Sequence, residues 1–337
     1  MRGFLKLYPA LSESKGCVLS FMPRPSHTSS YPAEASGDPS LAGAAALETL
    51  GAAVRQRIEA GEVDVPLLPQ VASQVLSLAI DPKADAARLS ALIHKDPSLA
   101  GRVLQIANSP AYMPKMPIVS LQQAVARLGL DTVVEIAFVA SLDGGTFEVP
   151  GYEDELENLW RHAIASGAFA KEIARIKRVN VESAFLCGLL HAVGKPALLQ
   201  VVADAEAELE RRSGCAGTLR GAVLAVLDQF HVGIGAKIAE AWRLPVQVTT
   251  AIVFHADYAA APSCKVDAMI AGLADAFATD LVRSRARGGG GAAEATAREA
   301  WLRQLPVVAD LNIYPSELDG LLAKRASVSQ IVESMMA

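Results

Sequence analysis

Signals that start and stop helices follow one another closely from residue 40 onward, and they constrain the fold of this chain more than any other feature. Asp96 is followed by Pro97, an N-cap residue and a first-turn proline that together favour the start of a helix. Ser120 begins another helical segment, and Gly61 ends an earlier one. Convincing alternation of the β type appears nowhere in the sequence. The sequence therefore predicts an all-α fold.

The composition agrees with this prediction. Hydrophobic residues make up 51% of the 337 residues but aromatic residues only 5%, so alanine, leucine and valine must fill the core. This composition favours closely packed helices over sheets. The net charge is −5, acidic and basic residues are interspersed, and no long basic run marks a nucleic-acid-binding face. We therefore expect neither DNA nor RNA as a partner.

The cysteines and the apolar segments indicate a cytoplasmic protein. The four cysteines are far apart and form no CxxC pair, which argues against a zinc ribbon, a redox motif or a disulfide framework. The N-terminal stretch is interrupted by Glu13, Lys15 and Pro23, so no signal-peptide core forms. No stretch approaches the roughly 20 apolar residues that span a bilayer. We expect reduced thiols and no membrane partner.

Composition shifts divide the chain into segments. Residues 1–38 are rich in Ser, Pro and Gly and are expected to be disordered. The segment DGGTFEVPG, residues 143–151, is the best internal boundary, and because it is short we expect one rigid unit. The predicted parts are a helical lobe at 39–142, a second lobe at 152–285, a Gly/Ala-rich linker at 286–299 and a helical segment at 300–337. The linker is expected to be a solvated hinge, with anion binding by its arginines as the alternative.

Individual helices can be placed within these lobes. In the first lobe we expect helices at about 40–60 and 68–80, followed by three capped helices and one reaching Leu142 after an N-cap at Asp131. In the second lobe, a long helix is expected at 153–177. Shorter helices are then predicted at 181–191, 196–212, 218–229, 232–242, 245–256 and 265–285.

The histidines are the candidate metal ligands or catalytic groups of this chain. Four histidines and one aspartate lie in five successive helical segments of the second lobe: His162, His191, His231, His255 and Asp275. Taken singly, a histidine on an apolar helical face is more often a hydrogen-bonded core residue than a ligand. Bundle interiors also gather metal ligands from facing helices in this way. Spacing alone leaves both interpretations open.

Several phrases occur together in a fixed order. They include Leu-Pro and Asp-Pro near the start of the first lobe, then Ala-Asn-Ser, then SLQQAVARLGL, LWRHAIASGAFA and Leu-Leu-His-x-x-Gly-Lys. Because these motifs occur in this order, the segment from about Val65 to Asp280 resembles the HDOD domain, the HD-related output domain of bacterial signalling proteins. The resemblance covers roughly two-thirds of the chain. It implies a two-lobed helical bundle whose second lobe is similar to the HD and HD-GYP phosphohydrolases.

The resemblance also implies a vestigial metal site. In the HD and HD-GYP enzymes, one or more metal ions are held by a His, a His-Asp pair and a later Asp. His162 matches the first His, His191 matches the His of the pair, and Asp275 matches the last Asp. His231 and His255 resemble the additional ligands of the HD-GYP branch.

One position departs from the active pattern. Ala192 stands where the active superfamily has the Asp that binds and often bridges the metals. Divalent ions need anionic oxygen ligands to offset the loss of water, and only Asp275 remains to supply one. A catalytic two-metal site is therefore not expected, although one iron, manganese or zinc ion held by the histidines is chemically allowed. Lys195 matches a lysine that faces the substrate phosphate in active relatives. Alternatively, it satisfies carbonyls at the end of the preceding helix.

We therefore expect a non-catalytic signalling or scaffold protein with no obligatory cofactor. The resemblance implies a role in two-component or cyclic-dinucleotide signalling. No receiver, kinase, cyclase or DNA-binding segment is visible, so the expected output is contact with a regulatory protein partner, with homo-oligomers as a further possibility. One alternative is a nucleotide sensor without turnover. The other is a metal-dependent phosphohydrolase that uses His162, His191, His255 and Asp275, with Lys195 as the phosphate contact.

Overall fold

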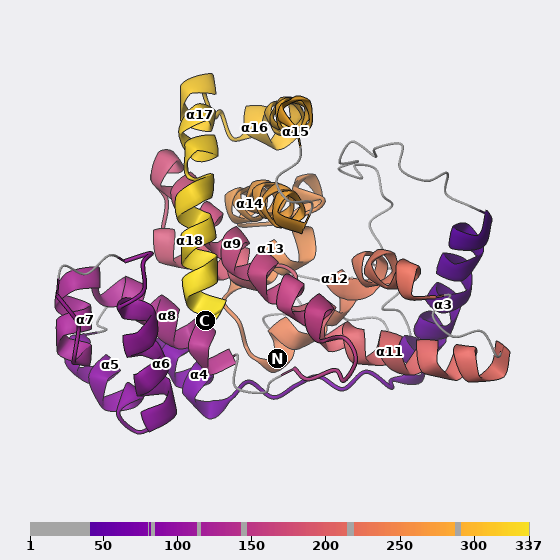
Figure 1. Ribbon diagram of the computed structural model, residues 1–337, viewed down its shortest axis with the longest axis horizontal. Coiled ribbons are helices and arrows are strands. Elements are labelled where there is room, and N and C mark those ends of the chain that lie inside the picture. Colours follow the sequence, from indigo (N-terminus) through magenta and orange to yellow (C-terminus); the bar gives the residue numbers. More distant parts are fainter. Residues whose placement is uncertain are drawn as a thin grey trace.

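The computed structural model describes residues 41–79, 81, 85–112, 116–142, 147–213, 219–286 and 291–336. All regular secondary structure within these ranges is helical, which confirms the all-α prediction (Figure 1). The segment predicted to be a disordered tail, residues 1–38, lies outside the described residues.

A small lobe contains the helices on the left of Figure 1. Asp85 and Asp96 cap two of them by accepting backbone hydrogen bonds, from Arg88 at 2.7 Å and from Leu99 at 3.1 Å. The central helix of the lobe is α8, which packs against α4, α5, α6 and α7 and is buried along most of its length. The helices of this lobe are α4 (Gln70–Ala79), α5 (Ala86–Ile93), α6 (Pro97–Ala107), α7 (Leu121–Leu128) and α8 (Leu130–Leu142).

Asn108 holds the loop that follows α6. Its side-chain amide donates to the carbonyl oxygen of Ile118 at 2.8 Å and accepts from the backbone N–H of Ile118 at 2.7 Å. The same amide also donates to the carbonyl oxygen of Leu104. The Ala-Asn-Ser phrase therefore joins the end of α6 to the segment before α7, which accounts for an asparagine at this position.

The larger lobe is built around α9, which packs against α10 and α14. Its helices are α9 (Glu153–Lys177), α10 (Val181–Leu190), α11 (Gly194–Ser213), α12 (Val223–Ala241), α13 (Val246–Phe254) and α14 (Lys265–Ala286), with short 3-10 turns η2 (Arg220–Ala222) and η3 (Tyr258–Ala260). Glycine permits the closest approach between two of these helices. A Cβ added at Gly194 would lie 2.0 Å from the carbonyl oxygen of His231, so only glycine fits there.

The first helix belongs to the larger lobe, which corrects the predicted 39–142 lobe. Helix α3 (Leu41–Ala60) packs on α11, α12 and η2, away from α4–α8 (Figure 1). Leu50 and Val54 are fully buried, and Arg57 Nη2 lies 2.7 Å from Glu208 Oε2 of α11. An apolar face predicts that a helix is buried but does not specify its partner. The non-helical segment after Gly61 carries the chain to α4, and Trp242 Nε1 donates to the carbonyl oxygen of Pro66 along it.

Two predicted helix boundaries are also wrong. The helices expected at 218–229 and 232–242 form one continuous helix, α12, because Phe230 and His231 are both buried and packing holds the helix through this point. Asp131 was expected to be an N-cap but lies in the first turn of α8. Other boundaries agree closely, and α9 has the predicted bounds.

The chain after α14 contains α15 (Ala292–Gln304), α16 (Pro306–Asp310), α17 (Pro315–Ala323) and α18 (Arg325–Met336). Most of the linker predicted at 286–299 is therefore helical. The physical reason is a buried ion pair: Arg298 Nε of α15 lies 3.0 Å from Asp280 Oδ1 of α14, and both side chains are almost fully buried. Helix α18 packs along α9 and also contacts α8, so the last helix touches both lobes.

Two helical runs, Val181–Arg212 and Arg220–Ala241, are long and apolar enough to pass a test for membrane spans, which the sequence was not expected to contain. Their apolar windows are 89% and 61% buried inside the protein. Burial of this kind is typical of the core helices of a soluble protein, and one or two such helices are weak evidence for a membrane protein.

Candidate metal centre

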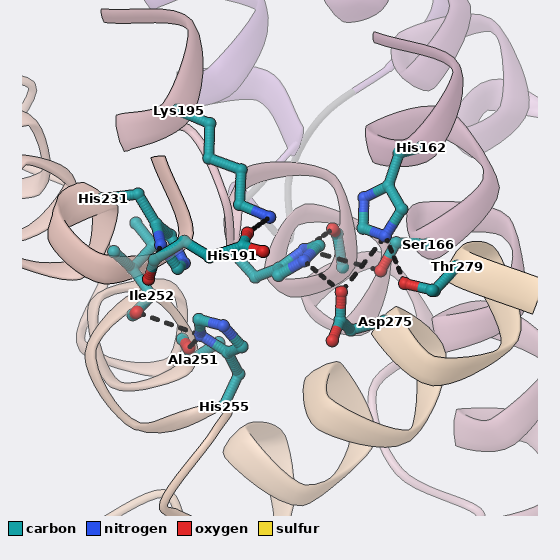
Figure 2. A network of polar contacts seen from close by, with 12 residues as sticks. His162, Ser166, His191, Lys195, His231, Ala251, Ile252, His255, Asp275 and Thr279 are labelled. Carbon is teal, nitrogen blue, oxygen red and sulfur yellow. Dashed lines mark hydrogen bonds and ion pairs between the residues drawn. The ribbon is translucent and has the colours of Figure 1, made fainter. Parts of the chain in front are cut away.

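Three of the predicted ligands converge between α9, the end of α10 and α14. His162 Nε2 lies 3.1 Å from Asp275 Oδ1, and His191 Nε2 lies 3.2 Å from the same oxygen. One potential ligand atom from each residue lies within 4.8 Å of the others (Figure 2). The His191 side chain is 1% exposed and the Asp275 side chain 35% exposed, so the cluster is buried on one side and open on the other.

The other ring nitrogen of His191 defines the chemistry of this contact. Its Nδ1 lies 2.6 Å from the carbonyl oxygen of Gly188, so Nδ1 carries the proton and donates it to that oxygen. In a neutral imidazole, Nε2 is then a lone-pair acceptor directed at the Asp275 carboxylate. Two acceptors 3.2 Å apart need a proton or a cation between them. A backbone contact that fixes the tautomer is typical of metal-binding histidines.

His255 and His231 continue the row beyond His191. The ring centroids of His191 and His255 are 5.0 Å apart, and those of His255 and His231 are 5.6 Å apart. Figure 2 shows both rings on the opposite side of His191 from His162. Each directs Nδ1 at backbone carbonyls one turn earlier, at 3.0–3.2 Å. His231 Nε2 is buried and has no hydrogen-bond partner within the described residues.

Burial sets the protonation states of these side chains. It lowers the pKa of His162, lowers the pKa of His255 to about 4, and lowers the pKa of His231 well below its usual range. For Asp275, burial alone would raise the pKa, but the contacts with His162 Nε2 and His191 Nε2 outweigh it and hold the pKa well below its usual range. His162, His231 and His255 are therefore largely neutral near pH 7, beside the ionised carboxylate of Asp275.

Lys195 lies at the edge of the cluster, in the first turn of α11. Its Nζ is 2.6 Å from Asp228 Oδ1 of α12. This partner is a carboxylate, whereas the predicted alternative has Lys195 donate to carbonyl oxygens at the end of α10. Lys195 is also the predicted phosphate contact, and its ammonium is already paired with a carboxylate of the same chain.

A family model for the HDOD domain matches residues 65–258, more than half of the 337 residues. The chain belongs to the HDOD family. The resemblance of the sequence to this family is thereby confirmed, although the match ends before Asp275, which lies beyond its last residue. A search of curated proteins gave no match to this HDOD chain.

Solved structures share the HDOD fold. An HDOD domain protein of unknown function from Geobacter sulfurreducens is 21% identical, with a TM-score of 0.61, and the alignment covers 86% of this chain and 98% of that one. A proposed phosphohydrolase from Shewanella amazonensis SB2B is also 21% identical, with a TM-score of 0.60 and coverages of 84% and 98%. A proposed signal transduction protein from Marinobacter aquaeolei VT8 is 25% identical, with a TM-score of 0.59 and coverages of 89% and 67%.

The donors in this HDOD protein fit one metal ion better than two. His162, His191 and Asp275 supply two imidazole nitrogens and one carboxylate, a set suited to zinc, iron or manganese. A second ion would need another anionic ligand between the two positions. Ala192, which directly follows His191, is 8% exposed and offers none. An ion bound to the triad would supply Lewis-acid character, and the residues of this chain would hold and orient it.

Sequence reasoning missed three polar residues of the HDOD site. Thr279 Oγ1 lies 3.2 Å from His162 Nε2, and Ser166 Oγ lies 3.5 Å from His191 Nδ1. Thr279 follows Asp275 by four residues on α14, and Ser166 follows His162 by four on α9, so helical periodicity could have identified both. Asp228 precedes His231 by three residues on α12, but the two helices predicted at 218–229 and 232–242 separated these residues and concealed the same periodicity.

Proposed function

We propose that this HDOD protein is a non-catalytic bacterial signalling module that acts in the cytoplasm by binding a regulatory protein partner. The observation that carries the proposal is the alanine at position 192, buried beside the metal triad where active relatives have a carboxylate. Without that oxygen, two divalent ions would bring four positive charges to a cluster with one carboxylate. The two-metal arrangement that clamps a phosphate and generates a nucleophile is therefore not supported.

The state of Lys195 favours the same proposal. A lysine that contacts a substrate phosphate does so through its ammonium, and here the ammonium lies 2.6 Å from the Asp228 carboxylate. A phosphate entering the site would have to displace Asp228 and would meet repulsion from it. Signalling function then resides in surfaces that bind other proteins, without DNA, RNA or a membrane as the partner.

A second candidate is a metal-dependent phosphohydrolase with a reduced ligand set. The observation in its favour is that His162, His191 and Asp275 still converge within 4.8 Å. Under this hypothesis His255 would complete the set, and the Lys195 ammonium would leave Asp228 to contact phosphate. A third candidate is a nucleotide sensor, which would be stabilised against heat by a nucleotide without hydrolysing it.

A turnover assay separates these functions. The full chain is reconstituted anaerobically with iron, manganese or zinc and incubated with cyclic dinucleotides, nucleotides and a chromogenic phosphodiester, beside a His191→Ala variant prepared identically. We expect both proteins to give the same background rate. Metal-dependent hydrolysis by the wild type that the variant lacks would overturn the proposal in favour of an enzyme. Nucleotide-induced thermal stabilisation without hydrolysis would instead identify a sensor.

A further inference from the structure

A cavity of about 390 Å³ lies where the two lobes and the last helix meet. Its walls come from the end of α8, residues 147–150, the first turns of α9 and the end of α18. In Figure 1 the end of α18 lies beside α8 and α9. The volume is within the range of pockets that bind small molecules. The apolar part of the wall is formed by Leu142, Phe147, Val149, Leu156, Trp160 and Met336.

The rim of this cavity is acidic. Glu148, Glu153 and Glu157 line it, and no lysine or arginine is among the described residues that line it. Glu153 accepts a hydrogen bond from the backbone N–H of Gly151 at 2.9 Å, and this contact helps to lower the pKa of its exposed carboxyl, so the carboxylate stays ionised. Glu157 is partly neutralised, because its Oε1 also lies 2.7 Å from Arg161 Nη2.

Two aromatic rings lie within the same wall. The ring centroids of Phe147 and Trp160 are 6.0 Å apart, and the rings are tilted by 57°. Both side chains are only partly buried and line the cavity. Tryptophan is the best of the aromatic side chains at attracting an ammonium or guanidinium group placed over its face. Aromatic faces beside carboxylates are complementary to a cation attached to an apolar stem.

We propose that this cavity is the docking site for a segment of a partner protein that presents a lysine or arginine among apolar side chains. The cation lies against Trp160 and pairs with the glutamates of the rim, and the neighbouring apolar side chains cover Phe147 and Leu156. This inference deepens the proposed function, because it names the surface and the partner chemistry through which a protein-binding module would act. It does not depend on the metal triad.

Selection from a random peptide library tests the proposal. Twelve-residue peptides are selected against the full chain, and the best peptide is labelled and its binding measured by fluorescence anisotropy. We expect the selected peptides to combine Arg or Lys with Leu, Phe or similar side chains. We also expect the affinity to fall about tenfold or more in a Glu148→Gln/Glu153→Gln variant, and to fall again as salt is raised.

A matched control distinguishes the effect of the rim glutamates on peptide affinity from the effect of the overall negative charge of the protein. Glu48 and Glu59 are exposed on α3, so a Glu48→Gln/Glu59→Gln variant removes the same charge far from the cavity in the sequence and on another helix. This control should bind the peptide as the wild type does. A Trp160→Leu variant should bind the peptide more weakly than the wild type, as the Glu148→Gln/Glu153→Gln variant does. Its thermal melting and circular dichroism show whether it is folded.

Several outcomes would overturn the proposal. These are the selection of no peptide, selected peptides that lack basic residues, or equal loss of affinity in the two double variants. Peptides that match a segment of this chain would show that a second copy occupies the cavity, which also contradicts a separate partner. Peptide binding by a protein that hydrolyses phosphodiesters would refute the proposed function and leave this docking site intact.

Discussion

His191 directs at Asp275 the ring nitrogen that is not bonded to the backbone. Nε2 lies 3.2 Å from Asp275 Oδ1, while Nδ1 lies 2.6 Å from the carbonyl oxygen of Gly188. The same oxygen of Asp275 also contacts His162 Nε2. A proton or a single cation satisfies all three side chains, and the alanine after His191 leaves no carboxylate for a second cation. Predictions about pH, charge and metal content follow from this arrangement.

Acid should destabilise the metal-free protein through its buried histidines. Burial lowers the pKa of His255 from 6.5 to about 4, so between these values the unfolded chain binds a proton that the folded protein does not. Stability contributed by His255 is therefore complete above pH 6.5 and is lost as the pH falls to about 4. The loss from this residue is on the order of 3 kcal/mol.

Denaturant unfolding at a series of pH values in the presence of a chelator measures this effect. A His255→Gln variant provides the control, because its free energy of unfolding should fall less over the same pH window. The same stability at pH 6.5 and pH 4.5 in the wild type would contradict the prediction.

Asp228→Asn should release the Lys195 ammonium for anion binding. The pair is partly exposed, with side-chain exposures of 17% and 63%, so its loss should change the free energy of unfolding by less than about 1 kcal/mol. The affinity for pyrophosphate, measured by titration calorimetry, should rise about tenfold, which corresponds to roughly 1.4 kcal/mol. Asp204→Asn removes the same charge from the exposed face of α11 and should have no such effect. Equal affinities in the two variants would refute this role of Asp228.

Gly194→Ala should destabilise the larger lobe strongly. The added methyl group would lie 2.0 Å from the carbonyl oxygen of His231, so α11 and α12 would have to separate. We expect a loss of about 3 kcal/mol or more. Gly101→Ala is a matched control on the exposed side of α6, where nothing lies within 4 Å of the added atom, and it should stabilise the protein by about 0.5–1 kcal/mol. Similar melting temperatures for both variants would contradict the close contact between these helices.

The sequence predicted well those features that local chemistry determines. Asp96 and Ser120 cap helices as predicted, and α9 runs from Glu153 to Lys177 as predicted. Packing partners were harder to predict, because an apolar face does not specify what covers it. For this reason the predicted first lobe wrongly includes α3, and the predicted linker includes Arg298, which is buried and holds α15 against Asp280.

In the candidate site, too, the sequence indicated the residues themselves but not the contacts that depend on tertiary packing. The likeness of the chain to a known family was enough to indicate His162, His191 and Asp275, which the structure brings together. It could not show that His231 and His255 form a row beyond that triad, because their distances depend on how α12 and α13 pack. Nor could it show that Lys195 pairs with Asp228, since this contact joins side chains of two helices across the tertiary fold.

Metal content is the most direct test of the central claim that the alanine at position 192 leaves room for one metal ion at most. The tag-free wild type and a His191→Ala variant are purified without oxygen, and iron, manganese and zinc are counted per chain. An Ala192→Asp variant restores the missing carboxylate and is measured beside them. We predict about one equivalent in the wild type, almost none in His191→Ala, and a second equivalent in Ala192→Asp only. Two equivalents in the wild type, or one that His191→Ala retains, would contradict the account.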